Sequence, residues 1–244
     1  MKEILFSLGS VEIYTFGIFI CLSFFLGFLL TIKLAHLEKI DNYFIFDLCL
    51  ASFLSALIVS KISFLLVYYS QLSSLSFVNA FLTSGFVFYP GLLTGILVWS
   101  LVVKSKKLDI KKWLDIGMVA FLFALTLAKI GNFLTTNVYG KISSLPFAVS
   151  NQHPVSIYEA LIYLTGAILL YLYRDKIKQG GIFILGLLIL AISDFVFGFL
   201  KISIINLGPF SLSQLFSLIL IIFLATAYLF PKAKRFWRRR NNVG

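Results

Sequence analysis

Residues 129–159 combine turn-forming and hydrogen-bonding residues within a chain that is otherwise largely apolar. The glycines Gly131 and Gly140 permit a close backbone approach, and Asn132 offers two donors and an acceptor to a polar headgroup. His153 is one of only two histidines, and its imidazole is the type of group that accepts a proton at neutral pH. The glycines and Asn132 fit a ligand site and a structured loop that caps a helix bundle equally well.

Four charged residues lie within or at the edge of apolar runs: Lys61, Lys129, Glu159 and Asp194. A charge in hydrocarbon is costly, so such residues face a cavity or pair with one another. We therefore expect Glu159 to pair with Lys129 or Lys61. Asp194 should pair with Lys61, Lys129 or Lys201. A structural ion pair and a functional polar pocket are both consistent with this pattern.

His153 and Pro154 directly precede an apolar run, which predicts a helix start with His153 as N-cap and Pro154 as the first helical residue. The histidine then acts as a base or simply closes the helix end. Pro90 falls inside another apolar run, where we expect a kink or a broken helix beside a site. Tyr89 either points its hydroxyl into that site or belongs to an aromatic belt at the outer interface.

The composition predicts an integral membrane protein that is all α-helical, because 60% of the residues are hydrophobic and only 13% are charged. The net charge of +11 is concentrated in short connections and at the C-terminus, which indicates membrane topology and not nucleic-acid binding. Cys21 and Cys49 lie in apolar runs without metal or redox spacing, so we interpret them as packing residues. Seven segments are long enough to span a bilayer: residues 14–32, 44–69, 86–103, 113–128, 157–173, 181–200 and 209–230.

Lysine and arginine gather after the third and fifth segments and in the C-terminal tail, while the other connections carry few charges. The positive-inside rule then places the N-terminus outside and the C-terminus in the cytoplasm, with residues 129–159 on the outer side. We expect one transmembrane domain over residues 1–230 and a basic cytoplasmic tail over 231–244, which anchors at the anionic leaflet. The first apolar segment has no cleavage site after it, so we expect it to be retained.

Two phrases of the sequence resemble those of bacterial prolipoprotein diacylglyceryl transferases, and the resemblance covers nearly the whole chain. The first runs from Lys129 through Gly131, Asn132 and Phe133 to the Tyr139-Gly140-Lys141 triplet, similar to the family's RIGNF signature. The second runs from His153-Pro154 to Tyr158-Glu159. Weaker similarity covers residues 11–17, Ser60-Lys61, the segment from Phe88 to Leu93, and the segment from Asp194 to Lys201.

The chain departs from the family at four positions. The family's essential histidine falls on Tyr89, its signature arginine on Lys129, its signature glutamate on Asn137, and an arginine of the sixth helix on Asp194. Lysine holds a phosphate as a point charge and lacks the bidentate grip of arginine. An aspartate near a phosphate repels it unless its charge is neutralised.

The resemblance implies a multi-pass enzyme of the bacterial plasma membrane that moves diacylglyceryl from phosphatidylglycerol to the lipobox cysteine of a prolipoprotein signal peptide. It implies no cofactor, no metal and no nucleic-acid partner. Lys129, Asn132 and Lys61 would bind the phosphate, and the thiol proton would pass to His153, with Tyr89 as a poorer base. One alternative is a catalytically impaired relative that binds phospholipid or lipoprotein without transfer, and a small transporter ranks last. The candidate catalytic residues are His153 and Tyr89, and the candidate substrate-binding residues are Lys61, Lys129, Gly131, Asn132, Gly140, Tyr158, Glu159 and Asp194.

Overall fold

The computed structural model describes residues 4–8, 11–69, 81, 85–135, 140–203 and 205–241. For residues 4–8, 11–13, 37 and 228–241 it describes the backbone only. Two antiparallel strands open the chain, β1 (Ile4–Leu8) and β2 (Val11–Tyr14), and α1 (Thr15–Ala35) follows β2 directly.

Long helices make up most of the described chain, as the composition predicted. Asp41 starts α2 by accepting a hydrogen bond from the Tyr43 backbone N–H at 3.1 Å, as expected of an N-cap aspartate. The other elements are η1 (His36–Glu38), α2 (Asn42–Val67), α5 (Phe88–Ser105), α6 (Ile110–Thr135), α7 (Val155–Leu172), η2 (Arg174–Lys176), α8 (Gly181–Gly198), β3 (Asn206–Leu207), β4 (Phe210–Ser211) and α9 (Leu212–Asn241).

Within the described residues, six helices (α1, α2, α5, α6, α7 and α8) are long and apolar enough to cross a membrane. The chain is therefore an all-α, multi-pass membrane protein. In α9 the apolar part with described side chains, Leu212–Ala227, is shorter, although the helix itself continues to Asn241. A seventh span over α9 and the orientation of the termini remain predictions.

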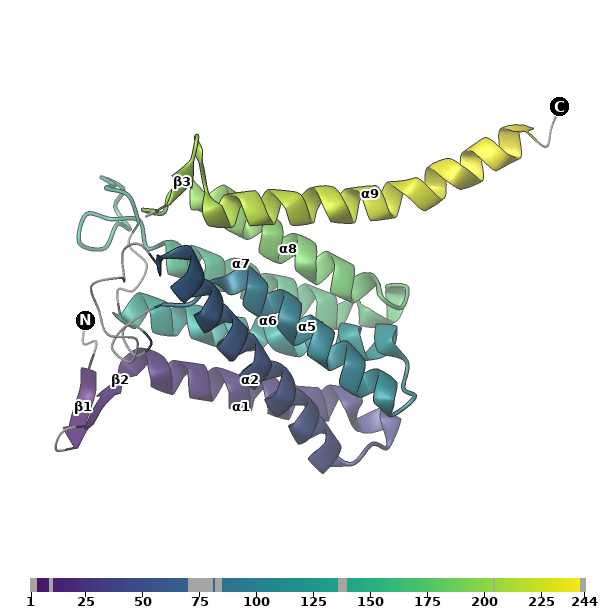
Figure 1. Cartoon of the computed structure of the whole chain (residues 1–244), viewed down its shortest axis with the longest axis horizontal. Helices are drawn as coiled ribbons and strands as arrows, with labels where there is room; N and C mark the ends of the chain where they lie inside the picture. The colour runs from purple at the N-terminus through teal and green to yellow at the C-terminus, as the bar shows by residue number, and fades with distance from the viewer. Residues whose placement is uncertain are drawn as a thin grey trace.

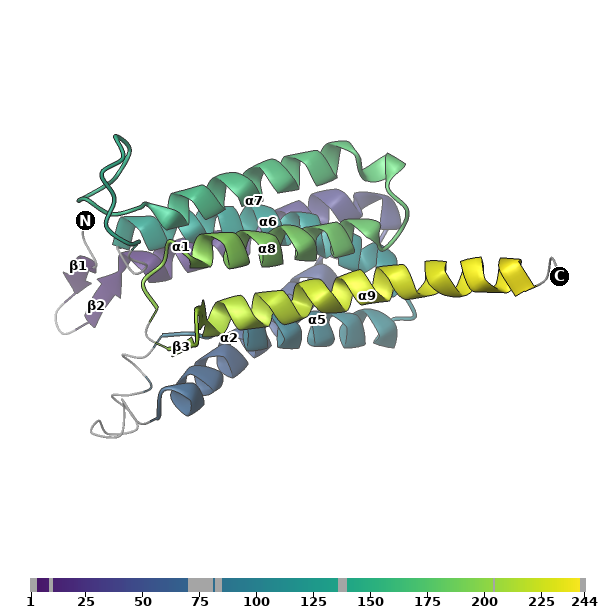
Figure 2. The ribbon, with the colours of Figure 1, turned by 90° about the horizontal axis from the view of Figure 1, so that it is seen from above.

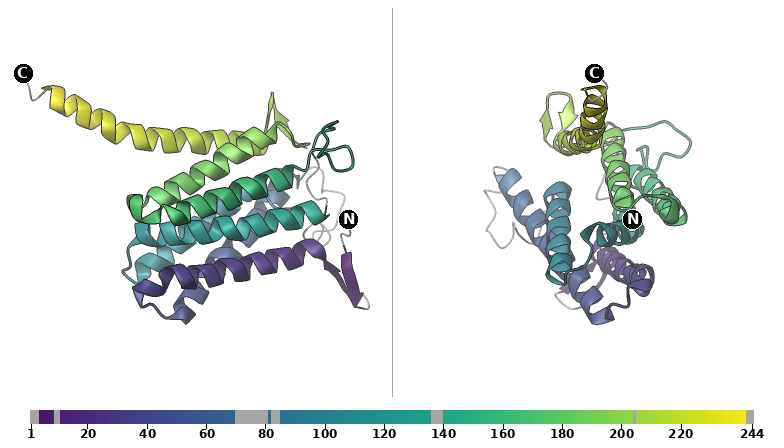
Figure 3. Two further views of the ribbon diagram at one scale, coloured as in Figure 1. Left: turned by 180° about the vertical axis from the view of Figure 1, so that it is seen from behind. Right: turned by 90° about the vertical axis from the view of Figure 1, so that its right-hand side faces the viewer.

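The helices lie alongside one another in one bundle (Figure 1). The β1–β2 hairpin, the connection between α6 and α7, and β3 gather at one end, and α9 projects past the bundle at the other (Figures 1 and 2). Helix α1 packs on α6, α6 on α7, α2 on α5, and α8 on both α7 and α9. The view along the helices in Figure 3 shows α2 and α5 as a pair at one side of the bundle.

Two clusters of buried apolar side chains hold the bundle together. The larger cluster contains side chains of α5, α6, α7, α8 and α9, and its most deeply buried members include Leu122, Ala167 and Leu190. The smaller one surrounds Trp113 at the opposite end from the β-hairpin, and the Trp99 indole N–H donates to the Trp113 carbonyl there at 3.1 Å. The α2–α5 pair is therefore joined to α6 at that end by aromatic packing.

The structure corrects two predictions about helix starts. Pro90 does not break a helix, because α5 begins at Phe88 and Pro90 lies in its first turn, where the missing N–H has no intrahelical partner to lose. Helix α7 begins at Val155, one residue later than predicted, so Pro154 is the N-cap and His153 lies before it. The backbone conformation of Pro154, with φ −76° and ψ 63°, is not helical, which places the boundary after it.

Candidate functional site

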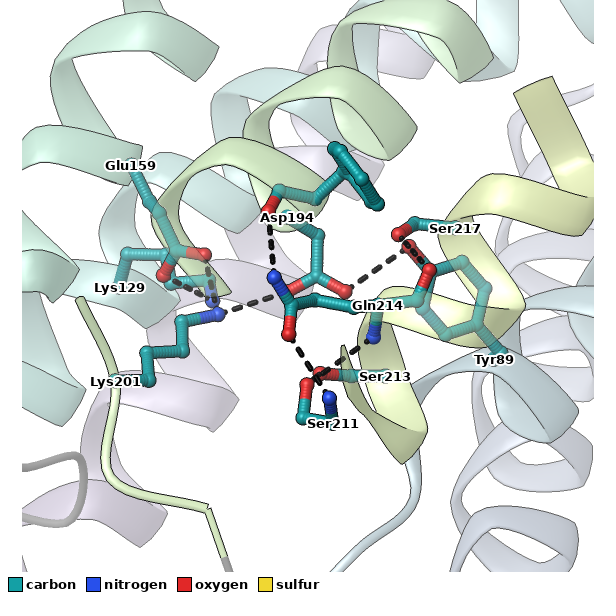
Figure 4. A network of polar contacts seen from close by, with 10 residues as sticks. Tyr89, Lys129, Glu159, Asp194, Lys201, Ser211, Ser213, Gln214 and Ser217 are labelled. Atoms are coloured by element: carbon teal, nitrogen blue, oxygen red, sulfur yellow. Dashed lines mark hydrogen bonds and ion pairs between the residues drawn. The ribbon is translucent and has the colours of Figure 1, made fainter. Parts of the chain in front are cut away.

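A chain of four charged groups and one phenol connects the ends of several helices inside the bundle (Figure 4). Lys129 Nζ lies 2.7 Å from Glu159 Oε2, and Lys201 Nζ lies 2.7 Å from Glu159 Oε1. Lys201 Nζ also lies 2.8 Å from Asp194 Oδ1, while the Tyr89 hydroxyl donates to Asp194 Oδ2 at 3.0 Å. We call these five residues the polar network. The predicted pairings of Glu159 with Lys129 and of Asp194 with Lys201 are confirmed.

Each member of the polar network comes from a different part of the bundle. Tyr89 lies in the first turn of α5, Lys129 lies in the last two turns of α6, and Glu159 lies in the second turn of α7. Asp194 lies near the end of α8, and Lys201 follows the end of that helix. These positions all belong to the end of the bundle where the α6–α7 connection lies, so the network ties four helices together at one level.

The α6–α7 connection fixes the backbone of Lys201. Gly140 pairs with Lys201 as an antiparallel bridge, and the Lys141 N–H donates to the Leu200 carbonyl at 2.7 Å. A side chain at Gly140 would collide with the His153 carbonyl, so glycine is required where these strands of chain pass each other. Gly140 thus acts through the backbone by letting the connection approach the segment that carries Lys201.

The formal charges of the polar network sum to zero when its two lysines and two carboxylates are ionised. Glu159 is fully buried and Asp194 is 9% exposed, so each carboxylate needs its cation. Burial lowers the pKa of the Lys201 ammonium and the nearby Lys129 lowers it further, but the Glu159 and Asp194 carboxylates outweigh both and raise this pKa above its ordinary value. Lys201 is therefore a permanently charged bridge between two acidic residues at neutral pH.

Helix α9 closes the network on the side of α8. The Gln214 side-chain amide donates to the Phe195 carbonyl at 3.1 Å, and its oxygen accepts from the Ser211 N–H at 2.9 Å (Figure 4). Ser211 Oγ in turn accepts from the Gln214 N–H, which completes a capping box at the start of α9. Tyr89 stacks on Phe216 of α9 with ring centroids 5.8 Å apart. These contacts hold the end of α8, and so Asp194, in place.

Two predicted site residues, His153 and Tyr158, lie together but outside the polar network. His153 Nδ1 is 3.5 Å from the Tyr158 hydroxyl, at the limit of a hydrogen bond. Both side chains line an open groove of about 450 Å³ beside the start of α7 and the end of α8, together with apolar side chains that include Phe147 and Phe197. The imidazole therefore lies at the edge of an apolar surface.

The remaining predicted residues have separate surroundings. The Lys61 ammonium lies over the Phe86 ring, 4.7 Å from its centroid. Gly131 packs against Phe19 of α1, where a Cβ would lie 2.7 Å from the phenyl Cγ. The Asn132 side chain is partly buried. Asn137 and Tyr139 lie outside the described residues.

Sequence reasoning named Lys201 only as one possible partner of Asp194, whereas the structure places it at the centre of the polar network. It also missed Tyr163, a buried residue of α7 whose ring lies 5.9 Å from Lys129 Nζ. Tyr163 is four residues after Glu159, on the same helix face, and this spacing is the signal that would have identified it. In the part of the chain that the structure describes, no three His, Cys, Asp or Glu side chains form a potential metal site.

Comparisons with known proteins identify the family of the chain. The sequence model of the family "Prolipoprotein diacylglyceryl transferase" matches residues 3–230. Proteins named phosphatidylglycerol–prolipoprotein diacylglyceryl transferase are similar over most of both chains: one from Finegoldia magna is 27% identical over 91% of this chain and 92% of its own. One from Clostridioides difficile is 26% identical over 96% and 98%, and one from Clostridium tetani is 28% identical over 91% and 94%. The chain therefore belongs to the prolipoprotein diacylglyceryl transferase family, a family of membrane transferases of lipoprotein biosynthesis.

Proposed function

We propose that the chain transfers the diacylglyceryl group of phosphatidylglycerol to the thiol of a lipobox cysteine in a prolipoprotein signal peptide. The names of the similar proteins supply the two substrates. The observation that carries the proposal is the polar network, since residues from both family phrases, Lys129 and Glu159, form an ion pair inside it. The catalytically impaired alternative receives no support from the comparisons.

Lys129 is the residue best placed to hold the donor phosphate. Its ammonium has three N–H donors, and among the described residues only Glu159 accepts one of them. Glu159 also accepts a hydrogen bond from Lys201, so the negative charge of its carboxylate stays paired with a cation when Lys129 turns toward a phosphate. The side chain of Lys129 is 16% exposed, whereas that of Glu159 is fully buried. A lysine at this position can therefore bind the donor phosphate in place of the arginine of the family signature.

The transfer forms a carbon–sulfur bond and breaks a carbon–oxygen bond. The cysteine thiolate attacks the terminal glyceryl carbon of the diacylglyceryl group, and the electron pair of the broken bond leaves with the phosphate oxygen as glycerol phosphate. The leaving group gains one negative charge, which the Lys129 ammonium stabilises. Because Asp194 is neutralised by Lys201 and hydrogen-bonded by Tyr89, its carboxylate does not present an unpaired charge to the phosphate.

His153 is the proposed acceptor of the thiol proton. His153 carries the only imidazole among the described side chains that line the groove, and histidine is the side chain that most often serves as a general base in enzymes. Tyr89 retains its proton as a donor to Asp194, so its proposed role is to orient this carboxylate toward Lys201. The groove beside His153 is apolar and suits the apolar segment of the prolipoprotein signal peptide.

We further propose seven membrane spans, with α9 as the seventh, in a bacterial cytoplasmic membrane. The N-terminus lies outside and the basic tail lies in the cytoplasm. This orientation places the polar network in the outer half of the membrane, where phosphatidylglycerol headgroups and exported prolipoproteins meet.

The purified protein in phosphatidylglycerol-containing proteoliposomes tests the proposal, with a lipobox peptide as acceptor and its mass as the readout. We expect a mass gain of one diacylglyceryl unit at the cysteine, and no gain in liposomes of phosphatidylcholine alone. The absence of a gain from folded protein, while a known family enzyme is active in parallel, would replace the proposal with the impaired alternative.

Two variants assign the roles within this reaction. The Lys129→Ala variant should bind phosphatidylglycerol more weakly, and unchanged binding would remove Lys129 from the phosphate site. The His153→Gln variant should keep its fold and lose turnover. If it retains turnover, His153 only lines the groove.

A further inference from the structure

Ser156 is a buried polar residue whose hydroxyl has no hydrogen-bond partner among the described residues. It is 1% exposed and lies in the first turn of α7. Leaving a buried hydroxyl without a partner is costly, and a native protein tolerates it where a ligand or water completes the hydrogen bonds. The position of Ser156 therefore needs an explanation.

Ser156 lies between the start of α7 and Glu159, which is paired with Lys129. It precedes Glu159 by three residues, so both side chains lie on the buried face of α7, about 4.5 Å apart along the helix axis. Helices α6 and α7 pack against each other in opposite directions (Figure 1), and the Lys129–Glu159 ion pair joins them (Figure 4). Asn132, three residues after Lys129 on α6, is therefore displaced toward the same end of the bundle as Ser156.

Asn132 differs from Ser156 in being only partly buried. Its side-chain amide makes no hydrogen bond to the described residues, whereas its backbone carbonyl accepts one from the Thr135 hydroxyl at 3.3 Å. A serine hydroxyl and an asparagine amide each donate and accept hydrogen bonds and carry no charge. The Ser156 hydroxyl and the Asn132 amide are therefore suited to bind a neutral ligand group that both donates and accepts hydrogen bonds.

We propose that Ser156, together with Asn132, forms a subsite for the hydroxyl groups of the glycerol headgroup of phosphatidylglycerol. The proposal rests on the proposed function, in which Lys129 holds the phosphate of this lipid. The headgroup glycerol is attached to that phosphate and carries two neutral hydroxyls, each of which donates and accepts. In this arrangement the cation recognises the charge of the donor lipid, and the neutral pair distinguishes its headgroup from others of equal charge.

Ser52 provides a matched control within the same protein. Its hydroxyl is also buried, at 9% exposure, and also lacks a partner among the described residues, but it lies on α2. None of the members of the polar network belongs to this helix. Replacing either serine with alanine removes one unpartnered hydroxyl, so a general packing effect would appear in both variants.

The test compares transfer from phosphatidylglycerol with transfer from phosphatidylpropanol, which has the same phosphodiester charge and no headgroup hydroxyls. The readout is the ratio of kcat/KM for the two donors, measured with a lipobox peptide in the unaltered protein and in the Ser156→Ala and Ser52→Ala variants. One retained hydrogen bond corresponds to about a fivefold preference for phosphatidylglycerol. We expect the unaltered protein and Ser52→Ala to show the same preference, and Ser156→Ala to show a preference about fivefold smaller.

The outcomes separate this inference from the proposed function. The unaltered protein could transfer from both lipids equally, or Ser156→Ala could keep the full preference for phosphatidylglycerol. Either result would show that the enzyme is active but that Ser156 does not bind the headgroup hydroxyls. An equal loss of preference in Ser52→Ala would also overturn the inference, because a remote hydroxyl would have the same effect. A folded, unaltered protein that transfers from neither lipid would refute the proposed function and the inference together.

Discussion

Replacement of Lys201 by methionine is the most direct test of how the polar network is stabilised. Methionine keeps much of the length of the side chain and removes the ammonium that joins Glu159 to Asp194. Glu159 then retains Lys129, but among the described residues Asp194 retains only the hydrogen bond from Tyr89. The variant would therefore contain a buried carboxylate without a cation.

The expected loss of stability follows from this unpaired charge. Removing one partner of a buried ion pair typically costs about 3–5 kcal/mol. The Lys201 and Asp194 side chains are 16% and 13% exposed, so water screens the remaining charge in part. We expect a destabilisation near the lower end, about 3 kcal/mol, which lowers the ratio of folded to unfolded protein roughly a hundredfold.

A double-mutant cycle with Asp194→Asn isolates the pair. The free energy of unfolding is measured in mixed micelles titrated with a denaturing detergent. Asp194→Asn removes the carboxylate that Lys201→Met leaves unpaired, so the double variant should be more stable than Lys201→Met alone. We expect a coupling of about 2 kcal/mol between the two sites.

The control for this cycle is Lys141→Met. Lys141 is exposed and belongs to the connection that binds the same backbone segment, so its replacement should change stability by no more than about 0.5 kcal/mol. Additive effects of Lys201→Met and Asp194→Asn, within about 0.5 kcal/mol, would refute the reasoning, because two independent sites behave in this way.

Three further predictions concern packing, capping and pH. Gly131→Ala should destabilise by about 1–3 kcal/mol because its Cβ would press on Phe19, whereas Gly17→Ala, with open space at its Cβ, should be neutral or stabilising in the same unfolding assay. Asp115→Ala should cost about 1–2 kcal/mol, since the Asp115 carboxylate accepts hydrogen bonds from two N–H groups at the start of α8 at 2.6 and 2.7 Å; equal stability of the variant in that assay would argue against this capping role. The raised pKa of Lys201 means that its stabilisation is fully present below the ordinary lysine pKa of about 10.4 and is lost as the pH rises through the higher pKa of the folded protein. The difference in stability between the unaltered protein and Lys201→Met should therefore stay constant from about pH 7 to 10 and shrink above, and a difference that shrinks already near pH 8 would contradict this assignment.

The sequence alone determined the class of fold and the residues that must be paired. Long apolar runs can satisfy their backbone hydrogen bonds in lipid only as helices, so their lengths predicted the spans. A charge inside such a run requires a partner, which restricted Glu159 and Asp194 to a few lysines. Length and polarity are local properties of the chain, and they are visible without coordinates.

Only the tertiary structure decided which lysine serves which carboxylate and where each helix begins. Asp194 and Lys201 are seven residues apart, about 10 Å along a continuous helix. They meet because α8 ends at Gly198 and the chain turns, with Lys141 holding the backbone of the following segment. The start of α5 before Pro90 and the separation of His153 from the polar network likewise depend on packing between distant segments. Such contacts are set by the approach of helices that the sequence pattern does not place relative to one another.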